Sequence, residues 1–456
     1  MNAISLRSWV GNWTLRLAIP PLFFAVLGLA LGCKKNIEVA GPSEGWCAFP
    51  VSRGNPAEGL RSPAFLKKLA TTGMLDLNAG YNGFIAPVKN GEKILVRGEF
   101  PHARYISFII YDQDFMFVDK LSDRDLVPVS GKNPFLPGVD RSGKTGEFEL
   151  TILMDKSPAG PRPANTLYAG VNHQGRTNKL LIFVYRVYLA DRGLGYRDGN
   201  AMAAYGGVNP PHFQIMASDG HAYCPDLQKL RAQVARTELS IIGANLGKIL
   251  NPRQAFGKPE SPPIWLNNAS TKTQRESALI LNDDTAYLML PVSAQFGDLL
   301  VLRWNPPRTP QETYTGQPFP TDYDLRYWSI TFAYLDHSRP LLVYTESTVA
   351  DIDVPTLPDG TRQLVIGLGG IARPASVPAS QWHSFKHKQG YLFMRNIMIR
   401  PDYPGNFFKL PPGKIPMTYD KYTPGGVYCS AAEFAQNPDL GLTRGKLLKL
   451  KAGQSL

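Results

Sequence analysis

The chain carries few of the residues and motifs that mark a catalytic or metal centre. It has four cysteines and seven histidines in 456 residues. No two cysteines lie close together, which argues against a zinc site. The pattern HExxH is absent, so the linear signature of a zinc protease is not present. An active site assembled from distant residues stays open, because catalytic groups are recognised by geometry.

Charge of one sign is rarely concentrated, although the chain is basic. The net charge is +12 and the isoelectric point is about 9.4. The only dense group of cations lies at residues 444–451, which is too short for an arm that binds nucleic acid. We therefore expect neither nucleic acid nor nucleotide as a partner.

One long uncharged apolar run occurs, at residues 17–32, behind Arg7 and Arg16. A positive start, an apolar stretch and an abrupt polar end are typical of a secretory signal. Residues 29–33, LALGC, resemble a bacterial lipobox, which predicts that Cys33 is diacylated and becomes the new N-terminus. A plain cleaved signal and a retained anchor are the alternatives. We expect an extracytoplasmic, membrane-anchored protein of the cell envelope, at the outer membrane or in the periplasm in a Gram-negative host. Lys34 stands where an Asp would be needed to keep a lipoprotein from the outer membrane, so its presence implies sorting to the outer membrane.

The chain contains an internal repeat. Arg104-Tyr105-x-Ser107 recurs as Arg326-Tyr327-x-Ser329, and Asp123-x-Asp125 recurs as Asp351-x-Asp353. Further anchors occur in the same order: 77–78 with 281–282, 94–97 with 300–303, 181–183 with 392–394, and 223–224 with 428–429. The predicted divisions are a signal at 1–33, a linker at 34–61, repeats at 62–235 and 261–436 joined by a linker at 236–260, and a basic tail at 437–456.

Composition and period predict a mainly β fold. Glycine (42) and proline (39) are plentiful, which suits short strands joined by turns. We expect tandem duplicated antiparallel β-sandwich or jelly-roll-like domains. Short helices are expected at 63–71, 225–237 and 430–436.

Export places the remaining cysteines in an oxidising compartment. If Cys33 is lipidated, Cys47, Cys224 and Cys429 remain, and at most one internal bridge forms. Spacing alone does not assign it. We favour Cys47–Cys224, which closes the first repeat.

The recurring motifs have two interpretations each. Tyr105 and Ser107, like Tyr327 and Ser329, share one face of a strand, where an aromatic ring beside Arg104 or Arg326 would suit a sugar or an anion. The Asp-x-Asp pairs would suit Ca²⁺. We favour a structural role for both motifs, since a duplicated scaffold keeps what folding needs. We therefore expect no metal or cofactor, with Ca²⁺ at Asp123/Asp125 or Asp351/Asp353 as the less favoured alternative.

Two motifs fall outside the repeat. Residues 138–145 spell GxxxxGKT, but a phosphate-binding loop needs a strand before it and a helix after it. The composition here favours a glycine-rich hairpin turn. His383 and His387 would share a metal on a helix, but Pro378 and Gly390 favour a surface loop.

The second copy contains an insert at residues 305–324, rich in proline and threonine. Loops of this length are commonly functional or disordered. We expect its aromatic residues to contact a ligand or partner, and its removal to leave folding intact. The loop candidates for binding are Tyr314, Phe319, Tyr323 and Trp382.

One pattern extends beyond the repeat motif. Arg104-Tyr105-Ile106-Ser107-Phe108, then Tyr111-Asp112, Asp125 and Asn133-Pro134-Phe135, resembles a pattern in uncharacterised bacterial secreted proteins. It covers mainly the first repeat, and the second copy lacks a clear counterpart of residues 133–135. The resemblance implies a β-rich extracytoplasmic domain and no particular activity.

Three functions are compatible with these features. The first is a non-catalytic envelope protein whose repeats bind a ligand or partner. The second is an extracellular hydrolase of polysaccharide or lipid with a site between the repeats, which a histidine or paired carboxylates facing such a cleft would support. The third is a structural subunit of an envelope complex.

Overall fold

The structure is a computed structural model. It describes residues 45–48, 76–113, 116–143, 145–172, 174–191, 206–225, 257–267, 282–335, 343–415 and 422–438. The predicted signal, Cys33, most of the linker at 236–260 and nearly all of the basic tail lie outside these residues. The helix expected at 63–71 and all but the first residue of that at 225–237 also lie outside them. The predicted limits of the repeats stay predictions.

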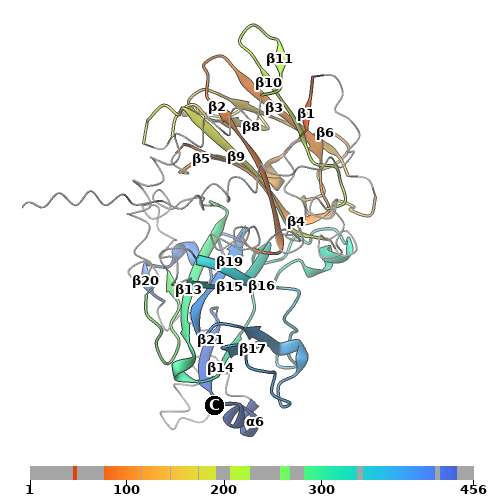
Figure 1. Ribbon diagram of the computed structural model, residues 1–456. Coiled ribbons are helices and arrows are strands. Elements are labelled where there is room, and N and C mark those ends of the chain that lie inside the picture. The colour runs from red at the N-terminus through yellow and green to blue at the C-terminus, as the bar shows by residue number, and fades with distance from the viewer. Residues whose placement is uncertain are drawn as a thin grey trace, which may run out of the picture.

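The prediction of a mainly β fold is confirmed. Four largely antiparallel sheets account for the described strands, two in each half of the chain (Figure 1). The α-helix α6 (Ala431–Gln436) begins at Ser430, whose side chain accepts from the Glu433 amide in a capping box. No described helix is long and apolar enough to span a bilayer. Single 3-10 turns are η1 (Asp123–Asp125), η4 (Ala294–Phe296), η5 (Gln311–Thr315), η6 (Ala379–Gln381) and η7 (Phe407–Lys409).

The first half forms a sandwich of two sheets, which we call sheets I and II. Sheet I has the order β2-β9-β4-β5, and sheet II has the order β1-β10-β3-β7-β6, with β11 on β10 and β8 parallel to β7. The strands are β1 (Cys47–Ala48), β2 (Ala79–Pro87), β3 (Lys93–Glu99), β4 (Ala103–Tyr111), β5 (Phe117–Ser122), β6 (Pro128–Ser130), β7 (Glu147–Leu153), β8 (Thr166–Tyr168), β9 (Leu180–Ala190), β10 (His212–Met216) and β11 (Ala222–Tyr223).

The second half forms a sandwich of sheets III and IV. Sheet III has the order β16-β15-β19-β13-β12-β20, and sheet IV has the order β18-β17-β14-β21, with β18 parallel to β17. The strands are β12 (Leu266–Asn267), β13 (Thr285–Ser293), β14 (Leu299–Trp304), β15 (Tyr327–Leu335), β16 (Val343–Ala350), β17 (Arg362–Leu368), β18 (Trp382–Phe385), β19 (Gln389–Ile397), β20 (Gly413–Lys414) and β21 (Gly425–Cys429).

The two sandwiches share one topology. Sheet I (β2-β9-β4-β5) matches β13-β19-β15-β16 of sheet III, and β10-β3-β7-β8 matches β21-β14-β17-β18, including the parallel last pair. The equivalent pairs β4–β5 and β15–β16 share a shift in register. It lies between Ile110 and Tyr111 of β4 and between Phe332 and Ala333 of β15. A one-residue irregularity at the same place in both copies is a conserved construction detail of the duplicated unit.

Strand register corrects some of the anchors. Arg186 pairs with Ser107 and Arg395 pairs with Ser329, so these two arginines are equivalent and the anchor 181–183 with 392–394 is displaced by two residues. Tyr81 and Tyr287 pair with those arginines, which displaces 77–78 with 281–282 likewise. A shift of two keeps every side chain on its own face, so the pattern of apolar residues did not reveal it.

The last anchor joins strands that are not equivalent. Tyr428 and Cys429 lie in β21, paired with β14, whereas Tyr223 lies in β11, paired with β10. A disulfide joins Cys47 and Cys224 with an S–S distance of 2.10 Å, the pairing that the sequence analysis favoured. Cys429 is buried and free.

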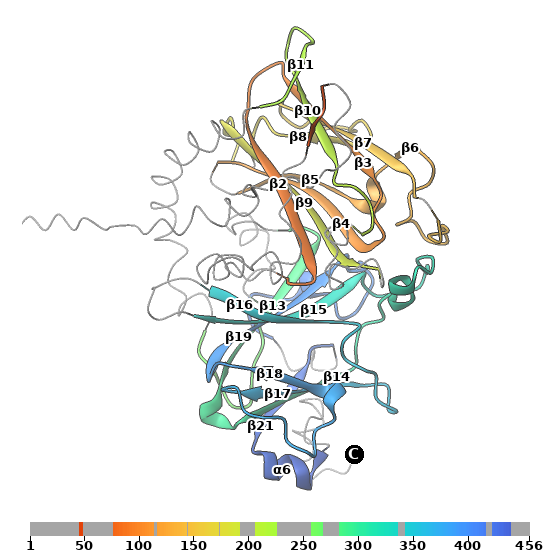
Figure 2. The ribbon, with the colours of Figure 1, turned by 45° about the vertical axis from the view of Figure 1, so that its right-hand side comes forward.

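Each sandwich has its own core, and the first sandwich meets the second at sheet III. In Figures 1 and 2 the lower ends of β2, β4 and β9 meet the sheet that contains β13, β15, β16 and β19. Inward-facing residues such as Phe108, Phe148 and Phe183 fill the first core, and Trp304, Trp328 and Ile366 fill the second. Burial of such large apolar side chains is the main stabilising contribution to each sandwich.

The insert at 305–324 crosses to the first repeat. Phe319 is 1% exposed, belongs to the core of the first sandwich and stacks on Phe135 with ring centroids 5.9 Å apart. Its carbonyl accepts from the Gly138 amide at 2.9 Å. The expectation that Phe319 is an exposed contact is therefore wrong, whereas folding without the loop stays a prediction. The sequence shows its apolar character but not which repeat would bury it.

Candidate functional site

The recurring arginines bind across the boundary between the repeats. Arg104 Nη1 donates to Asp351 Oδ2 at 2.6 Å, and Arg326 Nη1 lies 3.4 Å from Asp123 Oδ2. Each arginine also donates to the other's carbonyl, at 3.4 and 3.5 Å. All four side chains are at most 1% exposed. Each repeat therefore supplies the counter-charge that the other repeat buries.

Tyr105 and Tyr327 also each form a hydrogen bond to a carboxylate of the other repeat. Tyr105 donates to Asp284 at 2.8 Å, and Tyr327 donates to Asp76 at 3.0 Å. By register Asp76 is equivalent to Asn282 and Asn78 to Asp284, so the acid and the amide have changed places between the copies. Tyr105 contacts both members of its pair, with Asn282 at 3.4 Å.

The Arg-Tyr-x-Ser residues are consequently interface residues. Ser329 donates to Asp76 at 2.7 Å, and Ser107 is buried in the equivalent place. Arg104, Tyr105, Ser107, Arg326, Tyr327 and Ser329 are all 0–1% exposed and offer no open surface to a ligand. Their contacts are those of a structural motif, which is the role that the sequence favours.

The Asp-x-Asp pairs do not form ligand sets. Asp123 and Asp351 are buried against arginine, whereas Asp125 and Asp353 are exposed. Burial raises the pKa of Asp123 to about 6, against the opposing effect of Arg326. No group of three metal-ligating side chains occurs among the described residues.

The other motifs also take places in the scaffold. Residues 138–145 connect β6 to β7, and a strand rather than a helix follows them. His383 lies in β18 and His387 in the turn after it, where its ring stacks on Tyr334 at 3.6 Å. Tyr314 packs beside the interface, and Tyr323 accepts from Arg326 at 3.3 Å.

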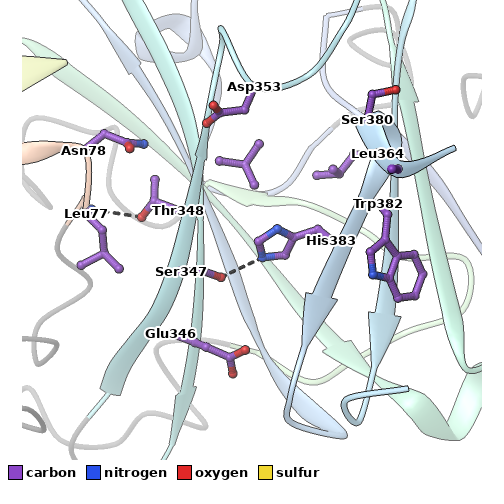
Figure 3. Close-up of a pocket in the computed structure, with 12 residues that line it drawn as sticks. Leu77, Asn78, Glu346, Ser347, Thr348, Asp353, Leu364, Ser380, Trp382 and His383 are labelled. Atoms are coloured by element: carbon purple, nitrogen blue, oxygen red, sulfur yellow. Dashed lines mark hydrogen bonds between the residues drawn. The ribbon is translucent and has the colours of Figure 1, made fainter. Parts of the chain in front are cut away.

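Trp382 is half-buried, and its ring packs on Gly367. A side chain at Gly367 would put its Cβ 2.2 Å from the indole, so glycine is required there. Since Trp382 and His383 are neighbours on one strand, their side chains point to opposite faces of β18 (Figure 3). The indole therefore does not face the histidine.

A pocket of about 450 Å³ lies beside β16 and β18, with lining residues from both repeats (Figure 3). Ser347 of β16 and His383 of β18 both line it and are hydrogen-bonded to each other, with Oγ and Nε2 2.8 Å apart. The first repeat contributes Leu77 and Asn78, and the Leu77 amide donates to Thr348 Oγ1 at 3.1 Å. The other lining residues are Glu346, Val349, Asp353, Leu364, Ala379, Ser380 and Trp382.

The pocket lies where the two copies differ. Asp119 pairs with Ile110 as Ser347 pairs with Phe332, and Leu167 pairs with Ile152 as His383 pairs with Ile366. Ser347 and His383 thus replace an aspartate and a core leucine of the first repeat.

In the first repeat the equivalent edge is closed. Asp119 accepts from the Tyr168 amide at 2.8 Å and from Arg162 at 2.8 and 3.0 Å, while Leu167 is fully buried. The sandwich therefore folds with these residues in place. Burying a histidine in place of the leucine lowers the stability of the fold, so the presence of His383 indicates a role other than stability.

The surroundings of His383 disfavour its protonated, positively charged form. Burial lowers the pKa of His383 to about 4, with Asp353 opposing the shift, so the imidazole is neutral near pH 7. Burial also raises the pKa of Glu346, although the Lys386 amide donates to this carboxylate at 3.0 Å. None of the described residues that line the pocket is lysine or arginine.

Comparison with known proteins shows structural likeness without a family. No family model matches the chain, and no curated protein matches it. A crystal structure of an uncharacterised protein from Burkholderia cenocepacia is similar, with a TM-score of 0.47, 13% identity and 86% of each chain covered. The VPA0106 protein from Vibrio parahaemolyticus has a TM-score of 0.36 and 11% identity, with 76% of this chain and 91% of that one covered.

We expect the substitution His383→Leu, which installs the first repeat's residue, to stabilise the protein, and to do so increasingly as the pH falls from 6.5 to 4. The unfolded chain protonates this histidine near pH 6.5, but the folded protein does so only near pH 4. The wild type therefore loses stability through that window, by at most about 3 kcal/mol from this residue. Denaturant unfolding of both proteins across this range measures the difference.

The reverse substitution, Leu167→His in the first repeat, is the matched control and should destabilise the protein with the same dependence on pH. A wild-type minus His383→Leu difference that does not change with pH would contradict this account of His383.

Proposed function

We propose that the protein is an exported binding protein and that its ligand site is the pocket between β16 and β18. The observation that carries this is the difference between the copies: the second repeat replaces Asp119 and Leu167 by Ser347 and His383 at the same places of one scaffold. Residues that folding needs are retained in a duplicated unit, whereas a stability-costing change at a pocket favours function.

The lining indicates the class of ligand. Glu346 and Asp353 supply carboxylates, Ser347, Ser380 and Asn78 supply neutral polar groups, and no cation lines the pocket among the described residues. Leu77, Val349 and Leu364 supply an apolar wall. A volume of about 450 Å³ lies in the range of small-molecule sites. We propose a small ligand with a cationic or hydroxylated end and an apolar part.

We propose that the protein lies in the cell envelope, anchored through a diacylated Cys33. We expect the mature protein to begin at Cys33 with a lipid mass and to sediment with membranes, because two acyl chains hold a protein stably at a bilayer. Mass spectrometry of the N-terminal peptide and fractionation measure this. Cys33→Ser should abolish both properties, and Cys429→Ser, a buried free thiol, should affect neither. A mature N-terminus elsewhere, or an unmodified Cys33, would refute the anchoring.

Binding is tested with benzyltrimethylammonium, a probe with a cationic end and an aromatic ring, against benzoate as its anionic counterpart. We expect calorimetry to show binding of the cation and not of benzoate. Glu346→Gln keeps an oxygen for the Lys386 amide but removes the charge, and should weaken binding about tenfold, the equivalent of roughly 1.4 kcal/mol.

Ser380→Trp on the rim should block the pocket. Asp125→Asn, at the place equivalent to Asp353 in the first repeat, is the matched control and should bind as the wild type does. Equal binding of benzoate, or full binding by Ser380→Trp, would show that this pocket is not the site.

A further inference from the structure

We infer that the pocket also catalyses acyl transfer, with Ser347 as the nucleophile and His383 as its general base. This inference rests on the proposed function, because it assigns chemistry to the same pocket. Ser347 Oγ and His383 Nε2 are 2.8 Å apart, within the reach that a nucleophile and its base require. Both residues line the pocket, so a bound ester would meet the hydroxyl directly.

Packing against the core of the second sandwich holds the His383 imidazole in position. The His383 ring stacks on Phe332, with ring centroids 4.0 Å apart and planes at 27°. Phe332 is fully buried and also contacts Phe385, so it is itself fixed by the core. A base whose ring is held by packing keeps its nitrogen directed at the hydroxyl and needs little reorganisation during the reaction.

A register shift between β15 and β16 determines which side chains lie beside Ser347. Phe332 pairs with Ser347, but the next residue, Ala333, pairs with Thr345, so Glu346 is the extra residue in β16. The Glu346 carboxylate then lies on the same side as Ser347, toward β18 (Figure 3). The Glu346 carboxylate, which also lies 3.4 Å from His387 Nε2, therefore lines the same pocket as the hydroxyl and the imidazole.

The protonation state of His383 indicates which class of ester can react. His383 is neutral at pH 7, so Nε2 can accept a proton when the ring carries its other proton on Nδ1. Because burial lowers the pKa of this imidazole to about 4, it is a weak base and gains less from proton transfer than an unperturbed histidine. A hydroxyl that is only weakly assisted reacts best with an activated acyl carbon, so we expect small esters with an acidic alcohol as leaving group, such as aryl esters.

The reaction balances without any co-reactant beyond water. Ser347 Oγ bonds to the acyl carbon while its proton passes to His383 Nε2. The bond from the acyl carbon to the leaving oxygen breaks, and that oxygen takes the proton from His383. Water then attacks the acyl-serine in the same way and releases the carboxylic acid, which restores the free hydroxyl. Nothing is oxidised or reduced in either half.

A fluorophosphonate probe tests the nucleophile directly, since it bonds to an activated serine with loss of fluoride. We expect the full-length protein to be labelled, and peptide mass spectrometry to place the adduct on Ser347. Ser347→Ala should lose the adduct, and His383→Gln should slow labelling by about 100-fold, the lower end of general-base contributions. Ser384→Ala, an exposed serine next to His383, is the control and should label as the wild type does.

The dependence on pH separates a base from a packing residue. The labelling rate should be constant from pH 8 to about pH 5 and should fall as the pH passes through about 4, because protonated His383 cannot accept the serine proton. An adduct on another residue, or an unlabelled wild type, would overturn the assignment of Ser347.

Binding of benzyltrimethylammonium keeps this test separate from the proposed function. If the probe binds the wild type and Ser347→Ala but no labelling occurs, the nucleophile is refuted and the binding site stands. If neither binding nor labelling occurs, both are refuted. Phenyl acetate hydrolysis by the wild type, lost in Ser347→Ala, would extend the assignment from the probe to an ester.

Discussion

Arg104 and Arg326 each bring a guanidinium into the protein, and each is matched by a carboxylate of the other repeat. An ion buried without its partner is far costlier than the same ion paired, because its lost hydration is not replaced. Neither repeat can therefore bury its own motif at low cost without the other. The Tyr105–Asp284 and Tyr327–Asp76 hydrogen bonds follow the same rule, so charge and hydrogen bonding both require the first sandwich to meet the second at sheet III.

This constraint also explains where the pocket lies. The interface fixes β15 through Arg326 and Tyr327, and β16 through Thr348, which accepts from the Leu77 amide. The far side of β16, which faces β18, is not used by the interface. There the second copy carries Ser347 and His383, whereas the first copy carries Asp119 bound to the Tyr168 amide. The pocket extends from the interface residues Leu77 and Thr348 to this side of β16, where the copies differ.

The sequence predicts the larger features and misses those that depend on contacts between strands. The mainly β fold follows from residue period, and the Arg-Tyr-x-Ser motif identifies β4 and β15 as equivalents. The motif does not show that its arginines face the partner repeat, because a strand's outer face is equally compatible with solvent. The burial of Phe319 is not predictable for a similar reason, since an aromatic residue in a long loop does not show which core receives it.

The pocket could not be found from local sequence. Ser347 and His383 are 36 residues apart and match no linear motif. One difference between the copies is visible in the sequence: His383 stands where the first repeat has Leu167. Recognising the two residues as equivalent requires the pairing of β7 with β8 and of β17 with β18. Those short parallel pairs carry little periodicity.

A double-mutant cycle across the repeat boundary tests the central claim most directly. Arg104→Met, Asp351→Asn and the double variant would be compared with the wild type by denaturant unfolding. The account predicts a coupling energy of at least about 1.5 kcal/mol, with the double variant more stable than the sum of the single changes implies. The exposed Arg308–Asp322 pair within the insert should couple by less than about 1 kcal/mol. Additive effects of Arg104→Met and Asp351→Asn would contradict the claim that the repeats depend on each other's charges.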